Sequence, residues 1–143
     1  HPTTLKINAL FEDTKNHFIS IENIQLIFEN TETIEIRSDA DYLKTIIRNL
    51  TSNAIKALEK TADAKITWKA WMENNNTYLS ITDNGPGATV EKFRALYNEN
   101  ETVGITTGLG LHLIRDLAKA INCKITVESE VNKGTTFTLT LNQ

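Results

Sequence analysis

The sequence has one cysteine, no long hydrophobic run and no excess of positive charge. Cys123 stands alone, so neither a disulfide within the chain nor a cysteine-based metal cluster can form. This agrees with a reducing compartment, and we expect a cytoplasmic domain. No apolar stretch approaches the roughly 18 residues that a membrane-crossing helix needs, and no signal peptide is visible, so direct membrane contact is not expected. The net charge of −3 gives no reason to expect nucleic-acid binding.

Length and composition indicate one soluble globular domain. The chain has 143 residues, of which 40% are hydrophobic and 23% charged, enough to bury a sizeable core. We therefore treat residues 1–143 as a single domain. The first residue is His1 rather than methionine, so we expect a piece cut from a longer protein.

Hydrophobic periodicity in the first half predicts helices and strands in mixed order. A first helix is expected from a cap at Asn8 to about Ile21, followed by two short strands, residues 24–28 and 33–37, around Asn30. Ser38 or Asp39 then begins a helix as its N-cap. The expected buried face of that helix repeats at helical spacing, at Leu43, Ile47, Leu50, Ala54 and Leu58.

The second half predicts two strand pairs and a long helix. Residues 64–72 alternate, with Ile66, Trp68, Ala70 and Met72 on one face, and pair across the turn at residues 73–77 with a strand that ends at Asp83. A short helix (89–97), a long helix (109–121) and strands 123–130 and 135–141, joined by a turn at 132–134, complete the order. This order predicts an α+β fold, a two-layer sandwich with one mixed, mostly antiparallel sheet and helices on one face.

One edge of the helix that begins near Ser38 carries an unusual polar set. Asn49, Asn53 and Lys56 follow at i, i+4 and i+7, beside the apolar stripe rather than opposite to it. A solvated edge would explain Lys56 alone, but the three together favour the rim of a pocket. An amide oxygen is a ligand for a Mg²⁺ ion that also holds substrate phosphates, and lysine supplies a point charge for phosphate.

Two polar residues are expected to point into the core. Asp83 is in phase with Leu79 and Ile81, and Thr135 is in phase with Phe137 on the last strand. A buried carboxylate needs hydrogen-bond donors, which a ligand such as a purine amine can supply. Asp83 opens the sequence DNGPG, in which Gly85 and Gly87 let the backbone approach a flat ligand.

A second glycine cluster precedes the long helix. Gly108 and Gly110 leave the N–H groups of the helix start accessible, and such a terminus attracts phosphate. The sequence contains no P-loop, and Leu113 replaces the third glycine of a Rossmann fingerprint. Residues 98–107 lack a core pattern and are predicted to form a mobile lid over a ligand.

Four motifs in order resemble a known family. NLTSNAIK, DNGPG, GLGL and KGTTFTLTL resemble the catalytic ATP-binding domain of sensor histidine kinases, a branch of the Bergerat-fold superfamily. The resemblance extends from about Leu5 to Leu141. It implies the Bergerat fold and ATP and Mg²⁺ as cofactors. It also implies an activity in which the γ-phosphate goes to a histidine on a separate dimerisation hairpin.

The resemblance also implies roles for individual residues. Asn53 would be the Mg²⁺ ligand, with Asn49 beside it and Lys56 on phosphate. Asp83 would accept a hydrogen of the adenine amino group, next to the glycines Gly85 and Gly87 of the same motif, and Thr135 would join the adenine network. The backbone of the second glycine box would hold phosphates; its residues are Gly108, Leu109, Gly110 and Leu111.

Asn49 favours a kinase over a hydrolase. In ATPase members of the superfamily a glutamate at the matching position activates water, whereas an asparagine cannot take a proton. The alternatives are a nucleotide-binding switch without transfer activity and a Bergerat-fold ATPase. The switch is supported by the lid, where no Lys or Arg occurs from Ala95 to Thr107 and only Lys92 or Arg94 could reach the γ-phosphate. Phe93 and Tyr97 stand for the family's aromatic box.

The expected partners lie outside this chain. The phosphoacceptor hairpin is absent, and His1, His17 and His112 are poor candidates for the phosphorylated histidine. The resemblance implies that the parent protein is a homodimer, for example an inner-membrane sensor, and that it acts on a downstream response regulator. The piece itself is expected to be monomeric.

Overall fold

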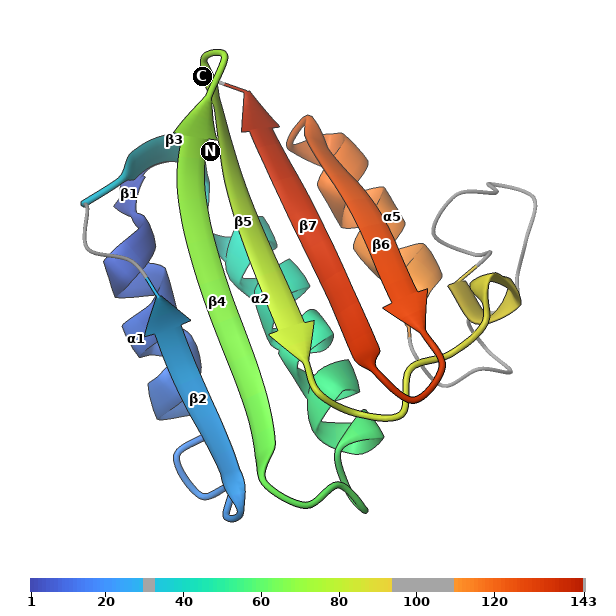
Figure 1. Ribbon diagram of the computed structural model, residues 1–143. Helices are drawn as coiled ribbons and strands as arrows, with labels where there is room; N and C mark the ends of the chain where they lie inside the picture. The colour runs from blue at the N-terminus through green and yellow to red at the C-terminus, as the bar shows by residue number, and fades with distance from the viewer. Residues whose placement is uncertain (30–32, 94–109, 143) are drawn as a thin grey trace.

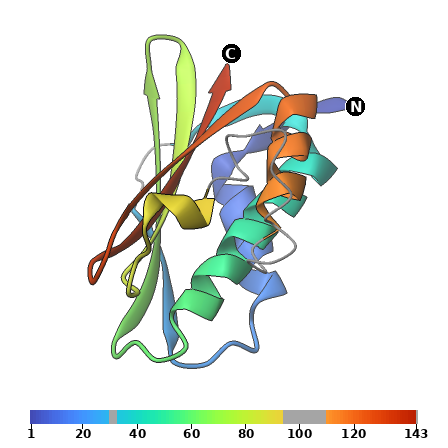
Figure 2. The same ribbon diagram turned by 90° about the vertical axis from the view of Figure 1, so that its right-hand side faces the viewer.

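The protein is a two-layer α+β sandwich in a computed structural model that describes residues 1–29, 33–93 and 110–142. Helices lie on one face of the main sheet, as the two views in Figures 1 and 2 show. The elements in chain order are β1 (Pro2–Lys6), α1 (Ile7–His17), β2 (Ile24–Glu29), β3 (Glu35–Asp39), α2 (Ala40–Ala57), β4 (Ala64–Glu73), β5 (Asn76–Asp83), the 3₁₀ turn η1 (Val90–Phe93), α5 (Leu111–Ala120), β6 (Cys123–Glu130) and β7 (Gly134–Asn142). No helix among the described residues is long and apolar enough to cross a membrane.

In the described part of the chain, the main sheet has five strands in the order β2-β4-β5-β7-β6. β2 pairs with β4 in parallel, while the β4–β5, β5–β7 and β6–β7 pairs are antiparallel. β1 and β3 form a separate antiparallel pair. The predicted α+β class, the mixed but mostly antiparallel sheet and the helices on one face are therefore confirmed.

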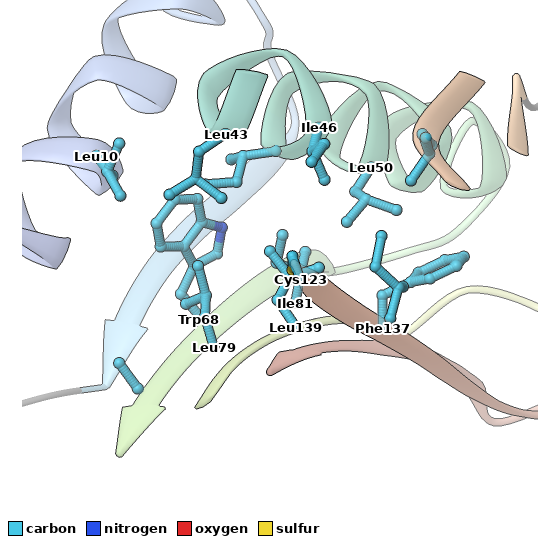
Figure 3. Close-up of a cluster of buried hydrophobic side chains, with 14 of the residues drawn as sticks. Leu10, Leu43, Ile46, Leu50, Trp68, Leu79, Ile81, Cys123, Phe137 and Leu139 are labelled. Atoms are coloured by element: carbon cyan, nitrogen blue, oxygen red, sulfur yellow. The ribbon is translucent and has the colours of Figure 1, made fainter. Parts of the chain in front are cut away.

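The core lies between α2 and the inner face of the sheet (Figure 3). All five residues of the predicted stripe, four on α2 and its C-cap Leu58, are buried. Trp68 of β4 is fully buried and meets Phe11 of α1 edge to face, with ring centroids 5.1 Å apart. Cys123 belongs to the same core, and burial raises the pKa of its thiol to about 12.

The first forty residues differ from the sequence expectation. The strand β1 was not predicted, and the strand expected at 33–37 runs instead over Glu35–Asp39, because it pairs with β1 from Pro2 to Lys6. α1 begins at Ile7 after Lys6, without a side-chain cap, so Asn8 lies inside the helix. It ends at His17 rather than Ile21. The β1–β3 pairs join residues 29 to 37 positions apart, and local periodicity does not report them.

One predicted cap is confirmed, one side chain is more exposed than its neighbours on the same face, and two predicted helices are described only in part. Asp39, one of the two residues predicted as the N-cap, caps α2: its Oδ1 accepts the N–H of Tyr42 at 3.0 Å. Met72 is 58% exposed because it lies next to the tip of the β4–β5 hairpin, which extends beyond the helices in Figure 2. The helix expected at 109–121 corresponds to α5, which is described from Leu111 to Ala120. Of the helix expected at 89–97, only the 3₁₀ turn η1 is described.

Candidate functional site

A small cavity lies between the second half of α2, the end of β5 and the start of β7. Its volume is about 90 Å³. α2 supplies a polar wall through Asn53, β5 supplies Asp83, and β7 supplies Thr135. The full lining is Asn53, Ala54, Ala57, Asp83, Pro86, Gly87, Ala88, Lys92, Phe93, Thr135 and Phe137. Motifs more than eighty residues apart in the sequence thus meet in one place.

Asp83 is the buried carboxylate of this cavity. Its side chain is 5% exposed, and its Oδ1 accepts the N–H of Gly85 at 2.9 Å. Burial raises the pKa of Asp83, while the backbone N–H groups of Gly85 and Thr135 oppose that rise. The inward orientation inferred from strand alternation is confirmed for Asp83 and also for Thr135, its Cα partner across the β5–β7 pair.

The polar edge of α2 is only partly in the cavity. Asn53 is 9% exposed and lines it. Asn49 is half-buried, and its Nδ2 donates to the carbonyl of Thr45 at 2.8 Å, which leaves its Oδ1 available. Lys56 is exposed. Neither Asn49 nor Lys56 lines the cavity, so any ligand they contact must extend beyond it along α2.

The DNGPG loop is held against the turn between β6 and β7. Gly87 has φ +67°, and a Cβ there would overlap the carbonyl group of Glu130. Gly134 has φ +128°, and a Cβ there would overlap the carbonyl oxygen of Asp83. The N–H of Asn132 donates to the carbonyl of Pro86 at 2.6 Å. The two glycines therefore allow the loop and the turn to touch backbone to backbone at the floor of the cavity.

Gly134 and Asn84 shape the site and were missed in the sequence. The side chain of Asn84 bridges to the start of β4, because its Oδ1 accepts the N–H of Lys65 at 2.8 Å and its Nδ2 donates to the carbonyl of Asp63 at 3.0 Å. Turn composition signalled that both positions lie in tight turns. It did not show which other segment each turn touches.

The far side of the cavity is formed by η1. Phe93 is buried and packs edge to face on Phe137, with ring centroids 5.8 Å apart. Lys92, which is exposed, also lines the cavity. Arg94, Tyr97 and the predicted lid at residues 98–107 lie outside the described residues.

The second glycine box is described in part. Gly110 is the N-cap of α5 with φ +62°, and Leu111 begins the helix fully buried. Gly108 and Leu109 lie outside the described residues. Within residues 1–29, 33–93 and 110–142, no group of three or more His, Cys, Asp or Glu side chains is placed to hold a metal ion.

Comparison with protein families and curated sequences gives consistent matches. Residues 38–143 match the model of the family described as histidine kinase-, DNA gyrase B-, and HSP90-like ATPase. Sensor histidine kinase ZraS of Escherichia coli K12 is 31% identical over 150 aligned positions, covering 98% of this chain and 32% of ZraS. Sensor protein BceS of Bacillus subtilis is 34% identical over 115 positions, covering 76% of this chain and 34% of BceS. The chain thus spans about a third of the length of these relatives.

Solved structures have the same fold. The catalytic domain of histidine kinase ThkA superposes with a TM-score of 0.81 and 26% identity, covering 99% of this chain and 95% of that domain. A second ThkA structure, solved in complex with the response regulator protein TrrA, matches with a TM-score of 0.77 and 23% identity, covering 98% of this chain and 41% of that chain.

Proposed function

The chain belongs to the histidine kinase-, DNA gyrase B- and HSP90-like ATPase family, and we propose that it is the ATP-binding catalytic domain of a sensor histidine kinase. In this proposal it binds Mg²⁺-ATP and donates the γ-phosphate to a histidine on a separate dimerisation domain of its parent protein. The domain works in the cytoplasm, and the parent is a homodimer that passes the phosphate to a response regulator. The response regulator seen with ThkA supports that last partner by analogy.

The observation that carries the proposal is the buried carboxylate of Asp83. This carboxylate accepts the backbone N–H groups of Gly85 and Thr135, and burial raises its pKa. An ionised carboxylate offers about four acceptor positions, so lone pairs remain for a ligand. It faces a cavity with an aromatic wall, Phe93 and Phe137, that suits a flat ring. An exocyclic amine of adenine supplies the missing donor. Gly85 and Gly87 give the ring room to approach the backbone.

The phosphates of the nucleotide would lie along α2, outside the cavity. Asn53 fits a magnesium ligand because it lines the cavity, and Mg²⁺ accepts one or two protein oxygens together with waters and phosphates. Bound there, the ion would neutralise phosphate charge. Lys56, further along the same edge, would contact phosphate. The backbone of Gly108, Leu109, Gly110 and Leu111, at the start of α5, would hold the remaining phosphate oxygens.

Asn49 directs the phosphoryl group away from water. Its amide oxygen cannot accept a proton at neutral pH, and its Nδ2 is engaged with the carbonyl of Thr45. The residue beside the phosphates therefore orients but does not activate a water molecule. ATP then persists until a nucleophile with its own lone pair, such as a histidine imidazole, reaches the γ-phosphate.

The test uses the longer parent protein and ATP labelled at the γ-phosphate. We expect acid-labile label on a histidine of the parent, lost in Asp83→Asn and retained in Thr126→Ala on the outer face of β6. Nucleotide binding without label transfer would instead indicate a switch. Steady, fast release of phosphate by this chain alone would indicate an ATPase and contradict the kinase.

A further inference from the structure

Ser129 of β6 lies behind Thr135 and connects three parts of the site. Its Oγ accepts the N–H of Ala88 at 2.9 Å and lies 2.7 Å from Oγ1 of Thr135. The same hydroxyl can donate to the carbonyl of Gly134 at 3.2 Å. Ser129 does not line the cavity, whereas Ala88 and Thr135 do. Any effect of Ser129 on a ligand must therefore act through these neighbours.

The pair of hydroxyls has two arrangements, with three hydrogen bonds within the protein in the first and two in the second. In the first, Thr135 donates to Ser129 and Ser129 donates to the carbonyl of Gly134. In the second, Ser129 donates to Thr135, and the proton of Thr135 is free to point into the cavity. The N–H of Ala88 donates to Ser129 in both. The second arrangement gives up the hydrogen bond from Ser129 to the carbonyl of Gly134, which at 3.2 Å is the longest of the three. A ligand that accepts the proton of Thr135 can therefore select the second arrangement at little cost in free energy.

The second arrangement suits the edge of an adenine ring. Asp83 and Thr135 are Cα partners across the β5–β7 pair, so their side chains enter the cavity side by side. Adenine likewise presents an amino donor and, one atom away, the ring nitrogen N1, which is an acceptor. A carboxylate next to a hydroxyl donor matches this order of groups.

We propose that Ser129 is a positioning residue that orients the Thr135 hydroxyl, so that its proton is donated to N1 of the bound adenine, directly or through one water molecule. The inference rests on the proposed function, because it takes adenine nucleotide as the ligand. It adds a residue outside the cavity that governs recognition of the ring. The removal of Ser129 frees Thr135 to turn its proton elsewhere and leaves the N–H of Ala88 without its acceptor.

The test compares ADP with 1-deaza-ADP, in which a C–H replaces N1 and the amino group is kept. We expect the native chain to bind ADP about threefold to tenfold more tightly than 1-deaza-ADP, the range for one neutral hydrogen bond. In Ser129→Ala this preference is expected to fall to about one. Ser129→Thr, which keeps a hydroxyl, restores it, and Thr126→Ala, an exposed hydroxyl on the same strand, leaves it unchanged.

The ratio separates recognition from a merely structural role. Loosening of the loop would weaken both nucleotides equally and leave the ratio as in the native chain, which would overturn the inference. A native chain that binds both nucleotides with equal affinity would overturn it as well, with the proposed function intact. A native chain that binds neither would contradict the proposed function itself. Should Ser129→Ala not fold, Ser129→Cys, a weak donor of similar size, gives the same comparison.

Discussion

Gly87 and Gly110 offer a matched pair for testing how the DNGPG loop is held. Their φ angles are +67° and +62°, so alanine costs the backbone about the same at both, roughly 1 kcal/mol. Their surroundings differ. A Cβ at Gly87 would overlap the carbonyl group of Glu130, which is backbone and cannot swing aside. At Gly110 no atom of the described residues lies within 4 Å of that position.

The difference between Gly87→Ala and Gly110→Ala therefore measures the contact between the loop and the β6–β7 turn. Overpacking against fixed backbone costs about 1–3 kcal/mol, so Gly87→Ala is expected to lose about 2–4 kcal/mol and Gly110→Ala about 1 kcal/mol. Urea unfolding followed by tryptophan fluorescence reports both, because Trp68 is in the core. Equal losses in the two variants would refute the claim that the loop and the turn touch backbone to backbone.

Three further outcomes follow from the site. Because the pKa of Asp83 is raised in the folded state, the folded chain binds the carboxyl proton more tightly than the unfolded chain does. The free energy of unfolding of the nucleotide-free chain should therefore fall as pH rises from 3.8 through that raised pKa. Urea unfolding at several pH values should show this decrease in the native chain and a flatter profile in Asp83→Asn. Asn84→Ala removes both bonds to the β4 start and should lower the free energy of unfolding by about 1–2 kcal/mol, measured in the same way. Asn49→Glu supplies a general base and should raise steady ATP hydrolysis by up to about a hundredfold, whereas Asn49→Gln should leave phosphate release unchanged.

Periodicity predicted most of the sheet and of α2 from the sequence. The alternation in β4, β5 and β7 is regular apart from the buried Ser80, because one face of each strand packs in the core and the other is more accessible, so even the inward side chains of Asp83 and Thr135 were identified. The helical stripe from Leu43 to Leu58 was equally clear. The buried residues of these elements recur at a regular spacing along the chain, and such local patterns can be recognised in a single sequence.

Long-range contacts were the part that the sequence did not reveal. β1 is defined by its pairing with β3, and Gly134 and Ser129 matter because of the loop they touch, which is 41 to 51 positions away. A glycine or a serine beside a turn has the same local signature whether or not another segment packs on it. The sequence therefore predicted the charged and amide groups of the candidate site, but it did not reveal the residues that hold those groups in place.

The most direct test of the account is the contribution of the adenine amino group to binding. The measurement is calorimetric titration of the chain, with magnesium present, by ATP and by purine riboside triphosphate, which lacks only that amino group. A hydrogen bond to the buried carboxylate of Asp83 predicts that ATP binds about tenfold to a hundredfold more tightly. Equal affinities, or no binding of ATP, would contradict the central claim that this carboxylate recognises the purine.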